Sequence, residues 1–177
     1  VGSHMTAEWP VYSGSVYVFE RQSSGDWIER QKLLASDQTY WDTFGWSVSI
    51  SGDIAVIGAK LSDGAGVNSG AAYVFERRGN GEWVERQKLQ AWDAAAEDIF
   101  GYSVSVSGSF IAVGAYGDSD NGDLSGSVYI FSRQADGSWK GIQKLVPTDG
   151  KIGDHFGISV SLTDLTVVVG ANGDDDS

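Results

Sequence analysis

A spacing of 56 residues recurs along this chain and constrains its fold more than any other feature. From Phe44 to Phe100 and from Phe100 to Phe156 the interval is 56, and four other signatures keep it without an insertion. The repeated signatures are Phe-Gly at 44, 100 and 156, Gly-Ala at 58, 114 and 170, Ser-Gly at 13, 69 and 125, Trp at 27, 83 and 139, and Gln-Lys-Leu at 31, 87 and 143. We therefore predict three copies of one structural unit.

The middle copy predicts four antiparallel strands. Apolar and serine residues alternate over 101–106, which is the period of a strand with one apolar face, and 110–115 is a nearly continuous apolar run that fits a strand covered on both faces. A β-branched and aromatic third strand follows at 127–131, and the Asp136-Gly137 pair, like Asn80-Gly81, favours a hairpin with a primed turn. The fourth strand starts at the repeated Trp and is more charged, as a solvent-exposed edge strand requires. Four strands graded in this way predict an all-β protein made of propeller blades, and a solenoid is the alternative.

The bulk composition limits the classes of partner. The chain has 24 Gly, 2 Pro and no Cys, which favours an all-β fold with tight turns and excludes disulfides and thiolate zinc sites. A net charge of −12 argues against nucleic acid and anionic membranes as partners, because both need a basic surface. No apolar run approaches the ~18 residues needed to span a bilayer, so no membrane insertion is expected. Divalent cations or basic protein surfaces fit this charge better.

These motifs resemble the FG-GAP repeat, the blade unit of the integrin α-subunit propeller and of many bacterial surface proteins. Phe-Gly-x-Ser-Val, Val-Gly-Ala and Ser-Gly-x-x-Tyr-Val-Phe type segments occur three times in register. The resemblance implies a β-propeller with a binding or adhesion role, outside the cell or on the surface of a bacterium. The sequence departs from the family at two points. Lys60, Tyr116 and Asn172 replace its Pro, and the family's calcium loop between the Phe-Gly and Gly-Ala strands is missing, so its metal sites do not transfer.

The repeat frame divides the chain unevenly. We assign residues 1–9 to a tag remnant and leader, because Gly2-Ser3-His4-Met5 is typical of a cleaved purification tag, and residues 10–177 to three repeats. These repeats form two whole blades flanked by two complementary half-blades, with a third and fourth strand at 15–19 and 27–33 and a second strand ending at 171. Half-blades leave unpaired edges, so we expect two chains to exchange strands head to tail and form a six-bladed homodimer. The alternative is a fragment excised from a longer propeller, with no ligand of its own.

One acidic loop is the candidate metal site. Alternating carboxylates around a tight Gly turn at 118–123 can gather the oxygen ligands that calcium requires, and the third copy repeats part of this pattern. The predicted calcium ligands are Asp118, Asp120, Asp123, Asp174 and Asp176. The alternative is a solvated loop held by Asx turns, because acidic surface loops are common and the spacing is not that of an EF-hand.

Residues that recur in every copy are assigned to the scaffold. Asp42, Asp98 and Asp154, and also Asp37, Asp93 and Asp149, are expected to accept hydrogen bonds from turn amides. The repeated Trp is expected to pack between blades. Aromatic residues that do not recur are the candidate ligand contacts, and they are Trp41, Trp46, Trp92 and Tyr102. They could anchor a protein partner or stack on a glycan, as in a lectin-like propeller.

Catalysis has little support in the sequence. His155 is the only histidine outside the tag, and the chain has no thiol, no nucleophile elbow and no phosphate-binding loop. We therefore expect a binding module and not an enzyme.

Overall fold

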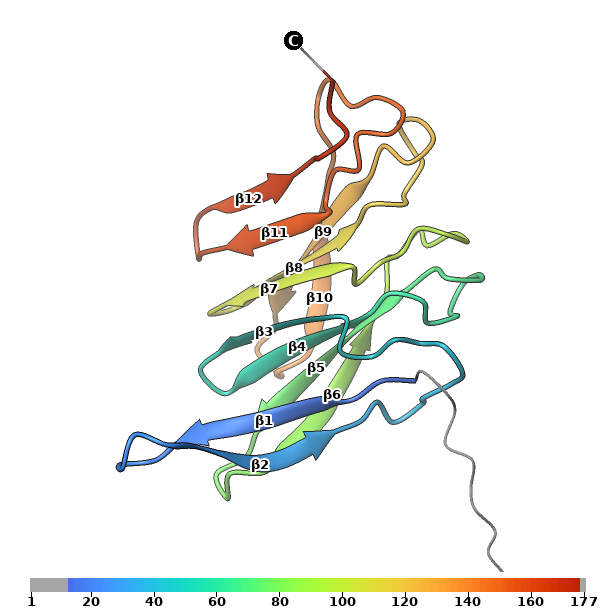
Figure 1. Cartoon of the computed structure of the whole chain (residues 1–177). Coiled ribbons are helices and arrows are strands. Elements are labelled where there is room, and N and C mark those ends of the chain that lie inside the picture. Colours follow the sequence, from blue (N-terminus) through green and yellow to red (C-terminus); the bar gives the residue numbers. More distant parts are fainter. Residues whose placement is uncertain (1–12, 176–177) are drawn as a thin grey trace, which may run out of the picture.

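A computed structural model describes residues 13–175, which form strands, turns and loops and contain no helix (Figure 1). The described residues therefore include no helix that is long and apolar enough to cross a membrane. The strands are β1 (Val16–Arg21), β2 (Trp27–Leu33), β3 (Ser47–Ser51), β4 (Ile54–Ala59), β5 (Ala71–Arg77), β6 (Trp83–Leu89), β7 (Ser103–Ser107), β8 (Phe110–Ala115), β9 (Ser127–Arg133), β10 (Trp139–Leu145), β11 (Ser159–Leu162) and β12 (Val167–Gly170).

The strands form four antiparallel sheets in which chain order equals spatial order. Strands β3 to β6 and β7 to β10 make two four-stranded sheets, and β1–β2 and β11–β12 make two-stranded sheets at the ends of the chain. The predicted four-stranded unit is therefore confirmed, and a two-stranded sheet lies at either end of the two four-stranded sheets. Each innermost strand begins two residues later than expected, at Ser47 and Ser103. The Phe-Gly pair that precedes it forms an isolated bridge to another blade instead.

The burial of each strand follows its composition. The apolar second strands β4 and β8 are buried along almost their whole length, as expected for strands covered on both faces. The charged fourth strand β6 buries only its first and last residues fully, Trp83 and Leu89. Burial therefore falls from the second strand of each four-stranded sheet to the fourth, while the innermost strands β3 and β7 are less buried than the second strands beside them.

The hairpins between third and fourth strands differ from the prediction. Gly81 has a φ of 88°, and its amide donates a hydrogen bond to the Arg78 carbonyl. The Arg78 amide in turn donates to the Glu82 carbonyl, which closes the loop. Asn80 does not have a positive φ, so the predicted primed turn, which needs two such residues, is wrong. A three-residue loop that ends in a left-handed Gly forms instead, and it recurs at Gly25 and Gly137.

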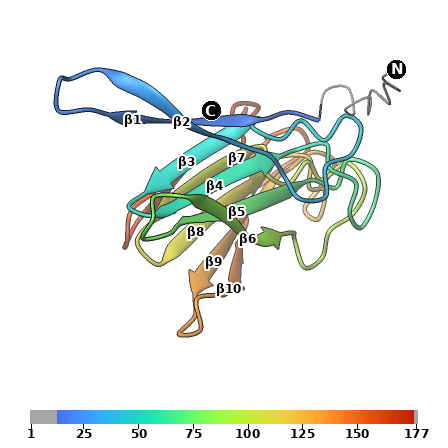
Figure 2. The same ribbon diagram turned by 90° about the horizontal axis from the view of Figure 1, so that it is seen from below.

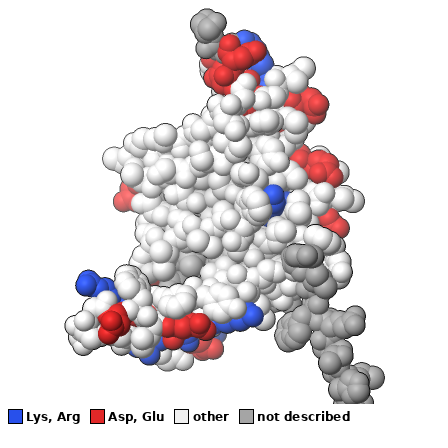
Figure 3. Space-filling view, viewed as in Figure 1, with Lys and Arg blue, Asp and Glu red and all other residues white. Residues whose placement is uncertain are grey.

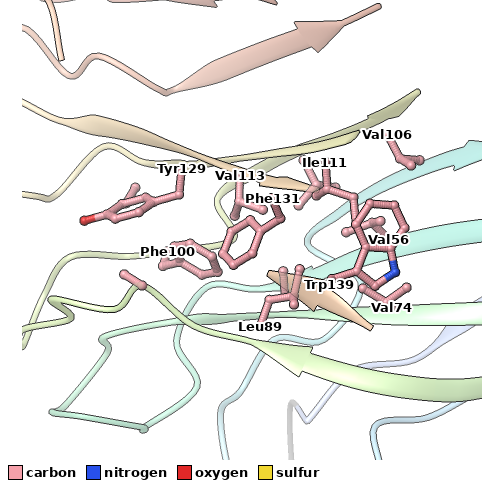
Figure 4. Packing of buried hydrophobic residues seen from close by; sticks show 14 of the residues in the cluster. Val56, Val74, Leu89, Phe100, Val106, Ile111, Val113, Tyr129, Phe131 and Trp139 are labelled. Carbon is pink, nitrogen blue, oxygen red and sulfur yellow. The ribbon is translucent and has the colours of Figure 1, made fainter. Parts of the chain in front are cut away.

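Neighbouring blades share their apolar cores. Ile54 and Val56 of one whole blade cluster with Val104, Val106 and Trp139 of the next, and Figure 4 shows part of this packing. Trp83 and Trp139 are each 5 % exposed, which confirms that the repeated Trp packs between blades in these two copies.

The Ser-Gly and Phe-Gly signatures meet where one blade leads into the next. Gly70 forms a parallel bridge with Phe100, and a Cβ atom on Gly70 would lie 2.0 Å from the Phe100 carbonyl oxygen. No side chain fits at that distance, and the Gly70 φ of 84° disfavours one further. The same contact recurs at Gly14–Phe44 and Gly126–Phe156, so the motif spacing reflects a repeated joint between blades.

The two half-blades lie at opposite ends of the stack. Figure 1 shows β1–β2 at the bottom and β11–β12 at the top, and Figure 2 shows the β1–β2 hairpin projecting past the adjacent sheet. In Figure 3 the face over the inner strands is largely uncharged, whereas acidic side chains gather along the margin formed by the loops.

Candidate functional site

A row of aromatic side chains lies at the loop end of the inner strands. Trp46 directly precedes β3 and Lys60 directly follows β4, and because these strands are antiparallel, with Ser47 opposite Gly58, the two residues are neighbours. Tyr102 and Tyr116 occupy the equivalent positions in the next blade. We call Trp46, Lys60, Tyr102, Tyr116 and the adjacent His155 the aromatic row.

Ring contacts run continuously along the aromatic row. The centroids of Trp46 and Tyr102 are 5.5 Å apart, those of Tyr102 and Tyr116 are 4.6 Å apart, and those of Tyr116 and His155 are 5.5 Å apart. The last two pairs are edge-to-face, the arrangement that aromatic quadrupoles favour. Three successive repeats thus contribute to one surface.

A cation already lies on this surface. Lys60 Nζ is 3.3 Å from the centroid of Trp46 and 5.2 Å from that of Tyr102. Burial lowers the pKa of Lys60, and burial likewise raises the pKa of Tyr116, with the charges of Tyr102 and Glu97 adding to it. Trp46 remains 48 % exposed, so part of its ring is open to a ligand. The row can therefore stack on a planar group or hold a cation.

The other two predicted ligand aromatics lie elsewhere. Trp41 stacks edge-on against Tyr40, at a centroid distance of 5.8 Å, in the loop before β3. Trp92 lies 4.9 Å from Tyr129 and covers Gly141, where a Cβ atom would come within 2.4 Å of the Trp92 ring. The structure thus brings together Trp46 and Tyr102 of the four predicted residues.

Sequence reasoning missed Lys60, Tyr116 and His155. Lys60 and Tyr116 both follow the Gly-Ala signature, and that shared position was the available signal. His155 occupies a left-handed backbone position, with a φ of 57°, which Thr43 and Ile99 share in the other copies. The conformation of the loop therefore determines the backbone position of His155. Its contact with Tyr116 arises only from the packing of the third copy against the second.

Two of the five predicted metal ligands, Asp118 and Asp120, belong to a second cluster, which we call the polar junction. Lys144 Nζ donates to Asp93 Oδ2 at 2.9 Å, to Asp118 Oδ2 at 2.7 Å and to Asp120 Oδ2 at 2.6 Å. The Tyr129 hydroxyl lies 2.7 Å from Asp93 Oδ1 and 2.8 Å from Asp118 Oδ2. Asp93 follows the outer strand of one blade, and the other four residues belong to the next, so the cluster ties two blades together.

A simpler polar junction recurs one repeat earlier. Lys88 Nζ donates to Asp37 Oδ2 at 2.7 Å and to Ser62 Oγ at 3.3 Å, and the Tyr73 hydroxyl donates to Asp37 Oδ1 at 2.7 Å. Ser62 stands where the following repeat has Asp118. The arrangement of Tyr, Lys and Asp is thus part of the repeat, and the extra carboxylates of the acidic loop are added to it.

Charge pairing controls ionisation in these junctions. Burial alone would raise the pKa of Asp93, but hydrogen bonds from Lys144 and Tyr129 outweigh burial and lower that pKa below its ordinary value. Burial would lower the pKa of Lys144, but the carboxylates of Asp118, Asp120 and Asp93 raise it. Burial and the adjacent carboxylates both raise the pKa of Tyr129. The Lys144 ammonium and the Asp93 carboxylate therefore stay charged at neutral pH.

Asp118 and Asp120 do not fit a calcium site. Asp118 is 3 % exposed, and the Lys144 ammonium stands where a cation would have to bind both Asp118 and Asp120. Among residues 13–175 no group of three or more His, Cys, Asp and Glu side chains is arranged to hold a metal ion. Asp123 is exposed, Asp174 lies in the loop after β12, and Asp176 lies outside the described residues. Asp120 donates its amide to Asp118 Oδ1 at 3.1 Å, which is the Asx turn of the alternative interpretation.

The repeated Asp residues divide into two classes. Asp42, Asp98 and Asp154 each accept a backbone hydrogen bond of 2.6 Å from the residue three positions earlier, which confirms their predicted scaffold role. Asp37 and Asp93 instead accept side-chain hydrogen bonds from Tyr and Lys of the following blade, so the prediction of turn amides as their main partners is wrong. Sequence reasoning missed these partners, although Tyr and Lys also recur at 56 residues.

Comparison with known families identifies the repeat. The family model described as FG-GAP repeat matches residues 27–75, 83–131 and 139–177. Each match starts at the repeated Trp, so the family's unit begins at an outer strand and continues into the next blade. No curated protein matches the chain.

Proposed function

The chain belongs to the FG-GAP repeat family, and on that premise we propose that it is a non-catalytic binding module whose ligand contacts the aromatic row. The observation that carries this proposal is the Lys60 ammonium held 3.3 Å from the Trp46 ring. A surface that holds a lysine of its own chain can hold a lysine or arginine of another. The protein's net charge of −12 attracts such a partner over longer distances. We infer a protein ligand that presents basic side chains, and the family resemblance suggests adhesion outside a bacterial cell.

A glycan ligand is the second candidate. Trp46 is half-exposed and Tyr102 lies beside it, and flat aromatic faces of this kind can stack on sugar rings. The two candidates differ in what Lys60 does. A cationic ligand must compete with the Lys60 ammonium, whereas a neutral sugar can stack beside it.

The binding test compares two tryptophans with similar exposure. Trp46 is 48 % and Trp92 is 53 % exposed, but only Trp46 belongs to the aromatic row. We expect Trp46→Ala to weaken binding of a labelled hexaarginine peptide by about tenfold, because a partly desolvated cation–π contact contributes roughly 1 kcal/mol or more. Trp92→Ala should change the affinity for the peptide less than about twofold, because Trp92 lies outside the aromatic row. The two variants have the same net charge, so a difference between them cannot come from long-range attraction. Lys60→Gln should strengthen binding by removing the competing ammonium.

Fluorescence anisotropy at constant ionic strength measures these affinities, with hexaglutamate as the negative control. Equal losses in Trp46→Ala and Trp92→Ala would remove the aromatic row from the proposal. Binding on a glycan array that depends on Trp46, without peptide binding, would favour the second candidate.

We also propose that the module closes into a six-bladed ring by exchanging strands between two copies. Three positions that are buried in the middle of the chain are open near its N-terminal end, two in the β1–β2 half-blade and one in the adjacent strand β3. Trp27 is 66 % exposed against 5 % for its equivalent Trp83, Tyr17 is 48 % against 0 % for Tyr73, and Val48 is 60 % against 8 % for Val104. The end surfaces thus have the composition of a blade-to-blade core, and apolar patches of this kind mark interfaces.

An apolar hollow of about 340 Å³ lies between β1 and the β3–β4 hairpin. Val18, Val48 and Ile50 contribute to its lining, and they are the repeat equivalents of Val74, Val104 and Val106. In the intact pair of blades these equivalents cluster with Val56. The residue that corresponds to Val56 at the open end is Val168 of a second copy, which is 66 % exposed. Each end therefore supplies what the other lacks.

Repeat symmetry defines how the strands should pair. In both whole blades the second and third strands place Ile57 opposite Tyr73 and Val113 opposite Tyr129. Extending that register places Val169 of β12 opposite Tyr17 of β1 from a second copy. One exchange at each end of two chains yields six blades, within the usual range for propellers.

Solution mass tests ring closure separately from ligand binding. We expect light scattering to give a mass about twice the 18.9 kDa of one chain. A monomer at micromolar concentration would overturn closure and favour the excised-fragment alternative. A ladder of larger assemblies would show head-to-tail contacts that fail to close.

A further inference from the structure

The polar junction occurs in two intact forms and in two separate halves. The intact forms pair a Tyr and a Lys from the third and fourth strands of one blade with an Asp that follows the preceding blade. One intact form consists of Tyr73, Lys88 and Asp37. The other consists of Tyr129, Lys144 and Asp93. In both forms the Lys nitrogen is 5.2 Å from the Tyr ring centroid.

The first half-blade carries the Tyr and Lys of a third junction. Lys32 Nζ lies 5.4 Å from the centroid of Tyr17, close to the spacing in the intact junctions. Neither Tyr17 nor Lys32 forms a hydrogen bond or an ion pair with an Asp in the part of the chain that the structure describes. The half-junction is therefore already arranged for a carboxylate.

The other end carries the corresponding acids. Asp149 is the repeat equivalent of Asp37 and Asp93, and Asp174 is the equivalent of Asp118. Among residues 13–175, Asp149 accepts no hydrogen bond and forms no ion pair. In the intact copies the Tyr and Lys that contact this Asp lie 36 and 51 residues further along the sequence.

We propose that Asp149 and Asp174 of one copy bind Tyr17 and Lys32 of a second copy, so that each seam of the ring contains an intermolecular polar junction. This inference rests on the ring closure proposed above and names the groups that recognise the partner. The occupant of the open edge is a second copy, because the chain itself carries both complementary halves. Charge complementarity between a lysine and two aspartates gives the contact its direction, head to tail.

A second set of contacts independently matches the two ends. In one interblade contact, the Ser36 amide and hydroxyl donate to Glu85 at 2.8 Å, whereas the following one packs Trp92 over Gly141. The position therefore varies between a hydrogen-bonding pair and a packing pair. At the open ends the corresponding residues are Thr148 and Glu29, which again combine a hydroxyl with a carboxylate. A mismatched combination, such as Thr with Gly, would not form either contact.

The backbone of the seam has its own repeated partner. Gln31 Nε2 donates to the Trp83 carbonyl and the Trp83 amide donates back to Gln31 Oε1, both at 2.8 Å, and Gln87 does the same with Trp139. At the seam these roles fall to Gln143 of one copy and Trp27 of the other. Three kinds of contact thus identify the same partner and the same register.

Charge reversal tests this junction. Lys32→Glu places an acid against Asp149, and Asp149→Lys places a base against Lys32, so each variant alone should dimerise at least about tenfold more weakly than the unmodified chain. An equimolar mixture should form heterodimers, because one seam then pairs Glu at position 32 with Lys at position 149 and the other seam keeps the original pair. Native mass spectrometry distinguishes heterodimers from homodimers by mass.

Lys140→Glu and Asp123→Lys are the matched controls, because they make the same charge changes at exposed positions outside the seam. Both should dimerise like the unmodified chain, and circular dichroism should show that all four variants keep the β-sheet signal. An unmodified dimer whose affinity is unchanged by Lys32→Glu and Asp149→Lys overturns the intermolecular junction but leaves ring closure intact. An unmodified chain that is monomeric overturns both.

Discussion

The hydroxyl of Tyr129 lies 2.7 Å from the carboxylate of Asp93, which belongs to the preceding blade, and Tyr73 and Asp37 repeat this relationship at the same distance. The hydroxyl of Tyr129 also lies 2.8 Å from Asp118, so it is placed between two carboxylates. Because the ring of each Tyr is buried in its own blade while its hydroxyl contacts another, one side chain couples core packing to the joint between blades.

Removing this hydroxyl should weaken the fold. We expect Tyr129→Phe to lower the free energy of unfolding by about 1–3 kcal/mol, since it leaves the buried Asp118 with one hydrogen-bond donor fewer. Tyr73→Phe should cost less, because Asp37 is more exposed to water. Urea unfolding followed by circular dichroism measures both, with the exposed Tyr40→Phe as the control. Equal effects in all three variants would contradict the role of the hydroxyl.

Lys144 should contribute more stability than Lys88. Lys144 pairs with three carboxylates, one of them buried, whereas Lys88 pairs only with Asp37 and the neutral Ser62. We expect Lys144→Met to lower the free energy of unfolding by about 2–4 kcal/mol, because it leaves clustered carboxylates without a counterion. Lys88→Met should lower it by about 1 kcal/mol or less. The same unfolding experiment compares the two, and a larger loss in Lys88→Met would contradict this ranking.

Calcium provides a test of the acidic loop. Because the Lys144 ammonium pairs with Asp118 and Asp120, we expect the melting temperature of the unmodified chain to be the same in calcium and in EDTA at concentrations on the order of millimolar. Lys144→Met frees these oxygens, so calcium should raise the melting temperature of that variant, and Lys88→Met should not respond. A rise in the unmodified chain that EDTA reverses would instead support the sequence-based calcium prediction.

Acid should weaken the joints between blades. The pKa values of Asp37 and Asp93 lie below the ordinary 3.8, since hydrogen bonds from Lys and Tyr outweigh the effect of burial. A lowered pKa in the fold stabilises it at pH above the ordinary value, and that contribution disappears as the pH falls through the lowered value. The melting temperature should therefore fall as the pH is taken below about 4. At constant protein concentration, the melting temperature of the double variant Asp37→Asn/Asp93→Asn should fall less over the same pH interval. If the double variant and the unmodified chain had the same dependence of melting temperature on pH, these two acids would be excluded as the cause.

Trp92 and Gly141 should behave as one unit. A Cβ atom on Gly141 would lie 2.4 Å from the Trp92 ring, so we expect Gly141→Ala to destabilise the fold by about 1–3 kcal/mol through overpacking. In the Trp92→Ser background the same substitution should cost much less, since the ring is gone and Ser is the residue at the equivalent position 36. A double-mutant cycle from urea unfolding gives the coupling energy. Additive effects would contradict the contact.

Local sequence patterns predicted the strands well because their determinants are local. Alternation at 103–107 and the apolar run at 110–115 reflect which faces of a strand are buried, and neighbours two residues apart encode that. Asp42, Asp98 and Asp154 were also predictable, because each accepts its hydrogen bond from a residue three positions away. The hairpin type was predicted wrongly, because Asx-Gly pairs suit both a primed turn and a loop ending in a left-handed Gly.

The sequence by itself determined the repeat, its period and its family, because all three are properties of residue order. Only the tertiary structure decided which side chains from different blades meet. Lys144 reaches an aspartate 51 residues away, and the aromatic row joins residues from three repeats. Such contacts depend on the angle and distance between blades, which arise from packing along the whole interface. The sequence of the 118–123 loop alone therefore suggested metal ligands. In the fold, the buried Asp118 and its neighbour Asp120 pair with the Lys144 ammonium from the next hairpin.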